Sequence, residues 1–168
     1  MSVRKQKGFT VLEMLIVLSI GALLAAFAIP GFQDMSAKNR VNSYAQEVTN
    51  MMALARNASV TNRRSVVMQR SGTGWEVRFD NATGTLLSQQ QSTPETVQFT
   101  IVPGDFARVV FDPTGYATVQ PTNMTATSPL VIALCDSGST REMGRNITVT
   151  RIGRVSSVQH TTPATCNP

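Results

Sequence analysis

Histidine and cysteine are scarce in this 168-residue chain, which has one histidine, His160, and two cysteines, Cys135 and Cys166. His160 lies in a polar tail, and no third ligand accompanies the two cysteines, so no metal-binding cluster is visible. Serine and threonine are plentiful, but no histidine and aspartate are arranged to activate them, which argues against a serine-type catalytic triad. Internal repeats and a distinct interdomain linker are also absent.

The N-terminus carries the most informative segment. A short basic leader ends at Gly8, and the 21 residues 9–29 that follow are apolar except for small or hydroxyl side chains and one carboxylate, Glu13. This run is long enough for a helix to cross a hydrocarbon core of about 30 Å. A carboxylate at the centre of such a span costs about 2.5–3.5 kcal/mol, and less near its end, so Glu13 is expected to have a functional partner.

The junction Gly8-Phe9-Thr10-Val11-Leu12-Glu13 before a long apolar run resembles the N-terminus of type IV pilins and of the pseudopilins of type II secretion. The resemblance implies that a prepilin peptidase cuts between Gly8 and Phe9 and that the new N-terminal Phe9 is methylated. It also implies that Glu13 pairs with the N-terminal ammonium of a neighbouring subunit's Phe9 when the helices bundle into a filament.

Two other interpretations of this segment stay open. The first is a secretory signal peptide, because Ala26-Phe27-Ala28 looks like a small-residue cleavage site. Against it, the apolar run is longer than the usual h-region of about 7–15 residues. The second is a plain membrane anchor, which fits the length but leaves Glu13 without a role.

After the anchor, apolar residues recur at gaps of three and four, which predicts that the helix continues in amphipathic form over about 31–62. Pro30-Gly31 predicts a kink or local unwinding between the two halves, because proline removes a backbone donor. The apolar stripe comprises Val41, Tyr44, Ala45, Val48, Met51, Met52, Ala55 and Ala58.

From residue 64 onward the pattern changes to short strands separated by turns, with Trp75, Val77 and Phe79 alternating with polar residues as in a half-buried strand. Loops are expected at 88–96 and 120–129. Strands are expected at 65–69, 75–80, 97–102, 109–111, 116–119, 130–135, 147–152 and 155–158.

The predicted fold class is therefore α+β and pilin-like. A long N-terminal helix, membrane-spanning in its first half, packs on antiparallel β-sheet. The expected domains are a leader (1–8), a transmembrane or filament-core helix (9–29) and a globular head (30–168), whose β-rich region starts at about 64. Since such a head lies in an oxidising compartment, we expect a Cys135–Cys166 disulfide. Closing that loop is worth roughly 3.5–4 kcal/mol on the chain-entropy account.

Beyond the N-terminus, the chain resembles the GspH/FimT/FimU class of minor pilins. The residues that carry this resemblance are the helical run 52–64, Phe111-Asp112-Pro113-Thr114-Gly115, and the segments 130–136, 145–149 and 152–155. The class implies a subunit that is not an enzyme and uses no cofactor, metal or small-molecule substrate. Its implied partners are other major and minor pilins, the prepilin peptidase and the inner membrane.

The resemblance implies a minor type IV pilin at or near the pilus tip that primes assembly. It would first span the inner membrane once with its head in the periplasm, and then reach the cell-surface pilus. One alternative is a FimT-like minor pilin that binds DNA during natural transformation. Another is a minor pseudopilin of type II secretion.

Arginines gather near the C-terminus, although the formal net charge of +5 falls to +2 once the three leader cations are removed. Arg145, Arg151 and Arg154 are the candidate DNA-binding residues, with Gly153-Arg154 matching a Gly-Arg-x-Arg-like motif of FimT members. Ser156 stands where the second arginine would be, and residues 117–168 contain no aromatic side chain to stack on bases. The alternative is that these arginines lie exposed on edge strands and discourage aggregation.

Overall fold

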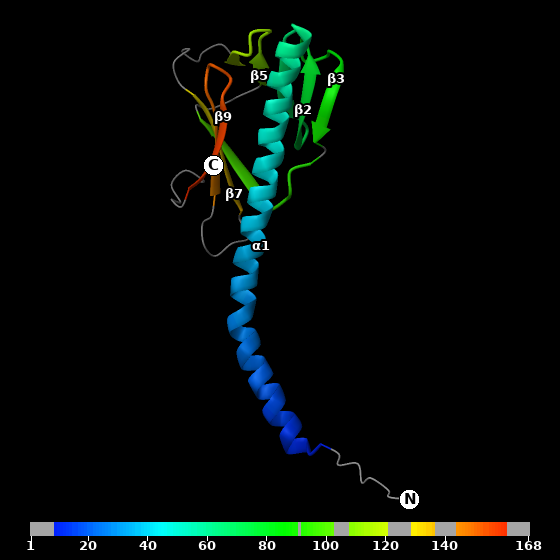
Figure 1. The fold of residues 1–168 in the computed structure, drawn as a ribbon. Coiled ribbons are helices and arrows are strands. Elements are labelled where there is room, and N and C mark those ends of the chain that lie inside the picture. Colours follow the sequence, from blue (N-terminus) through cyan, green and yellow to red (C-terminus); the bar gives the residue numbers. More distant parts are fainter. Residues whose placement is uncertain (1–8, 91, 103–107, 121–128, 137–143, 161–168) are drawn as a thin grey trace, which may run out of the picture.

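The computed structural model describes residues 9–90, 92–102, 108–120, 129–136 and 144–160. One helix, α1 (Val11–Asn62), dominates the molecule, and at 1.5 Å per residue it is about 78 Å long. Its first half projects alone, and the β-strands gather around its second half (Figure 1). The predicted α+β fold, a long helix packed on antiparallel sheet, is confirmed.

The strands form two antiparallel sheets. The first has five strands in the order β3-β2-β1-β5-β6, and the second has four in the order β4-β7-β8-β9. The first sheet contains β1 (Val66–Ser71), β2 (Gly74–Phe79), β3 (Leu86–Gln90), β5 (Arg108–Phe111) and β6 (Ala117–Gln120). The second contains β4 (Val97–Val102), β7 (Leu130–Asp136), β8 (Gly144–Val149) and β9 (Val155–His160).

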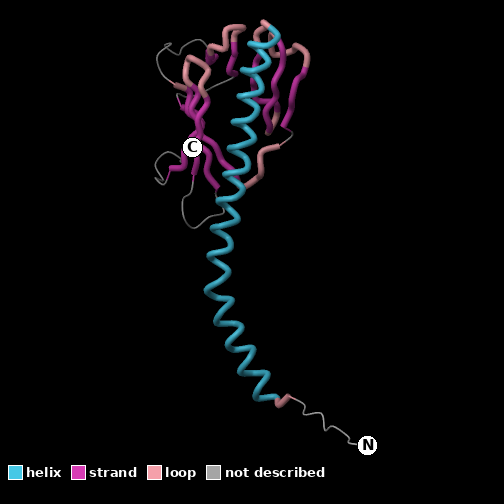
Figure 2. Tube along the Cα trace, in the orientation of Figure 1, coloured by secondary structure: helices cyan, strands magenta, loops and turns pink. Residues whose placement is uncertain are grey.

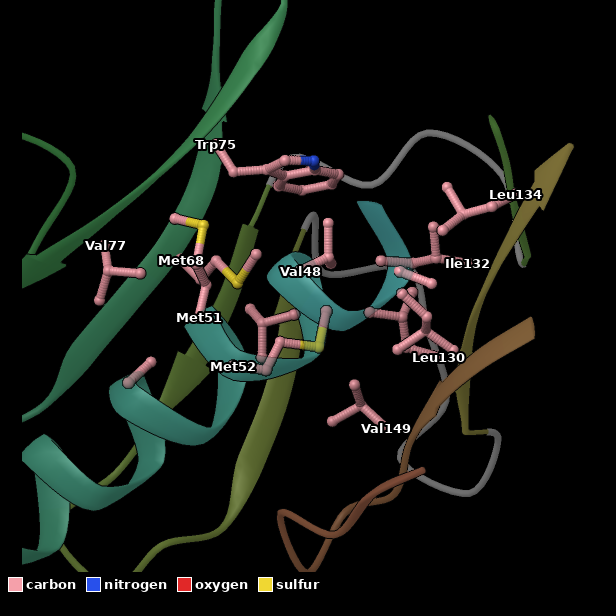
Figure 3. Close-up of a cluster of buried hydrophobic side chains, with 14 of the residues drawn as sticks. Val48, Met51, Met52, Met68, Trp75, Val77, Leu130, Ile132, Leu134 and Val149 are labelled. Carbon is pink, nitrogen blue, oxygen red and sulfur yellow. The ribbon is translucent and has the colours of Figure 1, made fainter. Parts of the chain in front are cut away.

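The predicted apolar stripe of α1 forms the centre of the core. Val48 and Met52 are fully buried, and Figure 3 shows them between Trp75 and Met68 of the first sheet and side chains of β7 and β8 from the second. A helix buried on both flanks holds the two sheets in one core, because each sheet covers a different side of the same stripe.

The helix runs without interruption through Pro30 and Gly31, so the predicted local unwinding there is wrong. Figure 2 shows a smooth curve along the lower half of α1 rather than a break. A proline removes a single backbone donor, and the hydrogen bonds of the turns on either side are enough to keep the helix continuous.

Three details of the sheets differ from the sequence prediction. The segment 88–96 is not all loop, because Leu86–Gln90 pairs with β2 as an edge strand. β8 starts at Gly144 and ends at Val149, so residues 150–154 form its turn to β9 and not the end of a strand. Glu76, predicted on the solvent side of β2, is 5% exposed. Arg78, and to a lesser extent Gln69, lower the pKa of Glu76 by donating hydrogen bonds to its carboxylate. These bonds satisfy the hydrogen-bonding capacity of the buried group.

Candidate functional site

The N-terminal end of α1 places Glu13 in the first helical turn. Thr10 is the N-cap, and its side-chain oxygen accepts a hydrogen bond of 3.2 Å from the Glu13 amide. Thr10 and Glu13 have the spacing of a capping box, and a carboxylate there is favoured by the helix dipole. Phe9 is 75% exposed, whereas Gly8, the other half of the predicted cleavage site, lies outside the described residues.

The lower half of α1 is an apolar surface that no other described part of the chain covers. Its large side chains, from Val11 to Ile29, are about half to four-fifths exposed. The segment includes an 18-residue window with a mean hydropathy of 2.4, and by length and composition this helix can cross a membrane. An apolar surface of this extent requires lipid or other helices as its cover.

An ion pair fixes the helix to the second sheet where the head begins. Arg40 donates from Nε to Asp136 Oδ2 (2.9 Å) and from Nη2 to Asp136 Oδ1 (3.2 Å). The Asp136 side chain is 1% exposed, and Thr96 donates a third hydrogen bond to it.

The adjacent Cys135 is disulfide-bonded. Cys166 lies outside the described residues, so the Cys135–Cys166 pairing stays a prediction.

The three candidate arginines do not form one patch. Arg145, near the start of β8, donates from Nε to Asn42 Oδ1 (2.7 Å) and from Nη1 to Ser157 Oγ (2.9 Å). Arg151 lies past the far end of β8, and Val149, the last residue of that strand, is already about 13 Å from Arg145. Arg145 thus connects the helix to β9, and its donors point toward the protein itself.

Arg151 and Arg154 lie together in the exposed turn between β8 and β9. The turn is closed by hydrogen bonds from the Gly153 amide to the Thr150 carbonyl (2.8 Å) and from the Thr150 amide to the Arg154 carbonyl (3.0 Å). Gly153 has a φ of +74°, a conformation that favours glycine. The turn therefore presents two arginine side chains to solvent from a defined backbone.

Sequence reasoning missed Arg56, which organises this end of the head. From the C-terminal part of α1, it donates to the carbonyl of Gly115 (3.3 Å) and to that of Ile152 (3.1 Å). Arg56 lies in the run 52–64 that carries the family resemblance, but its contacts could not be predicted, because both acceptors are backbone atoms of segments about 60 and 96 residues away. Exposed Arg63, at the C-cap, and half-exposed Tyr116 lie in the same region and were also missed.

Two shallow grooves of about 420 and 500 Å³ flank α1 on the β3 side, and both are lined by Ser43, Glu47 and Gln90. Within the described ranges, no three or more His, Cys, Asp and Glu side chains are grouped so that they could hold a metal ion. The described surface therefore offers interaction faces and shallow grooves.

Comparison with known families matches two parts of the chain. Residues 44–153 match the family described as type II transport protein GspH, and residues 3–29 match the prokaryotic N-terminal methylation motif. Together these matches span the apolar helix and most of the head.

The similar proteins are fimbrial proteins, a minor pilin and a minor pseudopilin. A fimbrial protein of Pseudomonas aeruginosa is 30% identical over 149 residues, which is 88% of this chain and 80% of that protein. The crystal structure of the type IV minor pilin FimU of P. aeruginosa has a TM-score of 0.60 at 22% identity and covers 79% of this chain and 99% of its own. The minor pseudopilin EpsH of the Vibrio cholerae type 2 secretion system has a TM-score of 0.54 at 12% identity, covering 71% and 96%.

Proposed function

The chain belongs to the GspH family of pilin-like filament subunits, and on that premise we propose that it is a minor type IV pilin. We infer that it enters the filament at or near the tip and primes assembly with other minor pilins. The observation that carries this proposal is the combination of a folded head and a projecting apolar helix with one carboxylate in its first turn. This function is structural and requires no catalytic site.

In this proposal the helix acts in two environments. After the cut between Gly8 and Phe9, the methylated Phe9 becomes the N-terminus, and residues 9–29 hold the subunit in the inner membrane with its head in the periplasm. During assembly the same apolar surface leaves lipid and packs on neighbouring helices. Glu13 then pairs with the terminal ammonium of an adjacent Phe9, which compensates for burying a carboxylate and fixes the axial register.

The test replaces Glu13 in the full-length protein and measures its amount in shed filaments and in the membrane fraction. Glu13→Val should insert into the membrane normally but be strongly depleted from filaments. Glu13→Asp, which retains the charge on a shorter side chain, should be depleted less. Wild-type levels of Glu13→Val in shed filaments would exclude the register role.

DNA binding is a second candidate function, supported by the exposed pair Arg151 and Arg154. Two phosphate contacts predict a weak, salt-sensitive affinity. On single-stranded DNA, the logarithm of the binding constant should fall with the logarithm of the salt concentration with a slope of about −1.4. The Arg151→Gln/Arg154→Gln variant of detergent-solubilised protein should then lose binding, whereas Arg145→Gln should retain it. Absence of binding by the wild type at low salt would exclude this candidate.

A minor pseudopilin of type II secretion is a third candidate, supported by the family match and by the fold shared with EpsH. Deleting the gene for this protein in its own organism separates the pilus candidate from the pseudopilus candidate. Loss of surface pili with normal protein secretion favours the pilus, and the reverse result favours the pseudopilus.

A further inference from the structure

Three segments that are distant in sequence meet at the end of the head opposite the N-terminus. Figure 1 shows the C-terminal end of α1, the β5–β6 connection and the β8–β9 turn together there. The Ala117 amide donates to the Arg151 carbonyl (2.8 Å) and so joins the last two segments. Arg56 hydrogen-bonds to both of them from α1.

This end of the head is preorganised. Gly115 and Gly153 both have positive φ values, of +84° and +74°. A Cβ added at Gly115 would lie 3.1 Å from Val60 Cγ2, and one added at Gly153 would lie 2.8 Å from Arg56 Nε. The two turns are therefore held against α1 with no spare space, and the side chains they expose project from a fixed backbone.

The exposed side chains are apolar and cationic. Val60 is 47% exposed, Tyr116 49% and Ile152 59%. The cations beside them are Arg63, Arg151 and Arg154, all exposed. We call this set of six side chains the distal surface.

The cations of the distal surface are available to a partner. None of the three makes a side-chain hydrogen bond or ion pair with another described residue. Two described carboxylates at this end of the head, those of Asp112 and Asp80, are already engaged. Asp112 accepts bonds from the Thr114 hydroxyl and the Tyr116 amide, and Asp80 pairs with Arg64.

We propose that the distal surface is the docking site for another pilin-like subunit, one whose contacting face is apolar at its centre and rich in carboxylates at its edge. The proposal rests on the proposed filament function, since the occupant is the subunit that lies beyond this one along the filament. Tyrosine and arginine are enriched among the residues that contribute most to binding at protein interfaces. Three arginines that pair with no described residue are complemented in charge by carboxylates on a partner.

A nucleic acid explains this surface less well. The arginines could bind phosphates and a base could stack on Tyr116. Proteins that bind single-stranded nucleic acid, however, use several aromatic side chains for stacking. Val60 and Ile152 are aliphatic and exposed, and they make no favourable contact with a charged phosphate and only a poor one with a base. A protein partner uses the aliphatic, aromatic and cationic groups together.

The test is photocrosslinking of the full-length protein in its own cells. Ile152 is replaced by p-benzoylphenylalanine, and crosslinked products are identified by mass spectrometry, with Gln98 on β4 as the background position. We expect a crosslink from position 152 to another protein that carries the N-terminal methylation motif. Arg151→Glu/Arg154→Glu should lower its yield by at least about tenfold, because like charges at an interface oppose docking. Lys38→Glu reverses the charge of an exposed side chain on α1 outside the distal surface, and it should leave the crosslink yield unchanged.

The outcomes separate this inference from the proposed function. Restoring the crosslink by changing the mapped carboxylate of the partner to lysine would establish the pairing. A yield at 152 no higher than at 98, a crosslink to nucleic acid instead, or a yield unaffected by the double reversal would overturn the docking proposal. If the protein is nevertheless present in shed filaments, the proposed function survives that failure. If it never enters filaments, the proposed function itself fails. Thermal unfolding of the double variant confirms that its head is folded.

Discussion

The tight contact of the β8–β9 turn with α1 makes a quantitative prediction for Gly153→Ala. A Cβ there would overlap the carbonyl oxygen of Gly115 and lie 2.8 Å from Arg56 Nε. The left-handed φ of +74° alone costs an alanine about 1–2 kcal/mol. Moving the turn away would also weaken the two hydrogen bonds that end on it, from Arg56 to the Ile152 carbonyl and from the Ala117 amide to the Arg151 carbonyl. At about 0.5–1.5 kcal/mol each, the total loss of unfolding free energy is about 2–5 kcal/mol.

Gly72→Ala is the matched control. Gly72 lies in the β1–β2 turn with a φ of +61°, and a Cβ added there meets no atom within 4 Å. This variant should lose only the conformational part, about 1–2 kcal/mol. The difference corresponds to a melting temperature roughly 10 °C lower for Gly153→Ala, at about 3–5 °C per kcal/mol for a domain of this size.

Thermal unfolding of the two full-length variants in detergent measures this difference. Trp75, the single tryptophan, is 1% exposed in the core, so its fluorescence reports on unfolding of the head without interference. Equal melting temperatures for the two variants would show that the turn is not held against α1. That result would also contradict the fixed backbone on which the docking proposal for the distal surface depends.

Further predictions concern the core, the ion pair and acid stability. Met52→Ala should lower the free energy of unfolding by about 2–4 kcal/mol, because Met52 is fully buried. Met35→Ala, whose side chain is 56% exposed, should change it by less than about 0.5 kcal/mol in thermal melts. Asp136→Asn should lower the melting temperature several times more than Asp80→Asn, since only the Asp136 carboxylate is buried in its ion pair. Hydrogen bonds from the Thr114 side chain and nearby amides lower the pKa of Asp112. Its stabilising effect is therefore complete above the ordinary carboxyl pKa of about 4 and is lost as the pH falls below that value. Melting temperatures between about pH 2 and 7 should fall less steeply on acidification for Asp112→Asn than for the wild type.

The helix and its buried face were readable from the sequence because they depend on local periodicity. Val48 and Met52 repeat at helical spacing, and the structure buries both. The edge strand β3 was missed because Ser88, Gln89 and Gln90 are polar and lack the alternation of a half-buried strand. Its pairing with β2 is a tertiary effect that local propensity does not report.

The candidate recognition residues were only partly predictable for a related reason. Arg145 and Arg151 are close in sequence, but they lie at opposite ends of β8. Strand pairing turns Arg145 toward Asn42 and leaves Arg151 in the turn. The contacts of Arg56 join segments about 60 and 96 residues away. A sequence identifies such charges, but only the folded chain determines which of them face a partner.

The position where burial begins along α1 bears on how the helix functions. Among the helix residues whose burial is described, Ala37, at 1% exposure, is the first buried one, and it divides Val11–Asn62 into a projecting and a packed half of 26 residues each. The projecting half is about 39 Å long, longer than a hydrocarbon core of about 30 Å. Phe32 and Met35, 68% and 56% exposed, therefore lie near the membrane surface when residues 9–29 span the bilayer. If the proposed filament function holds, the same two side chains continue the apolar surface toward the head, and we expect helix packing between subunits to extend about one to two turns beyond Ile29.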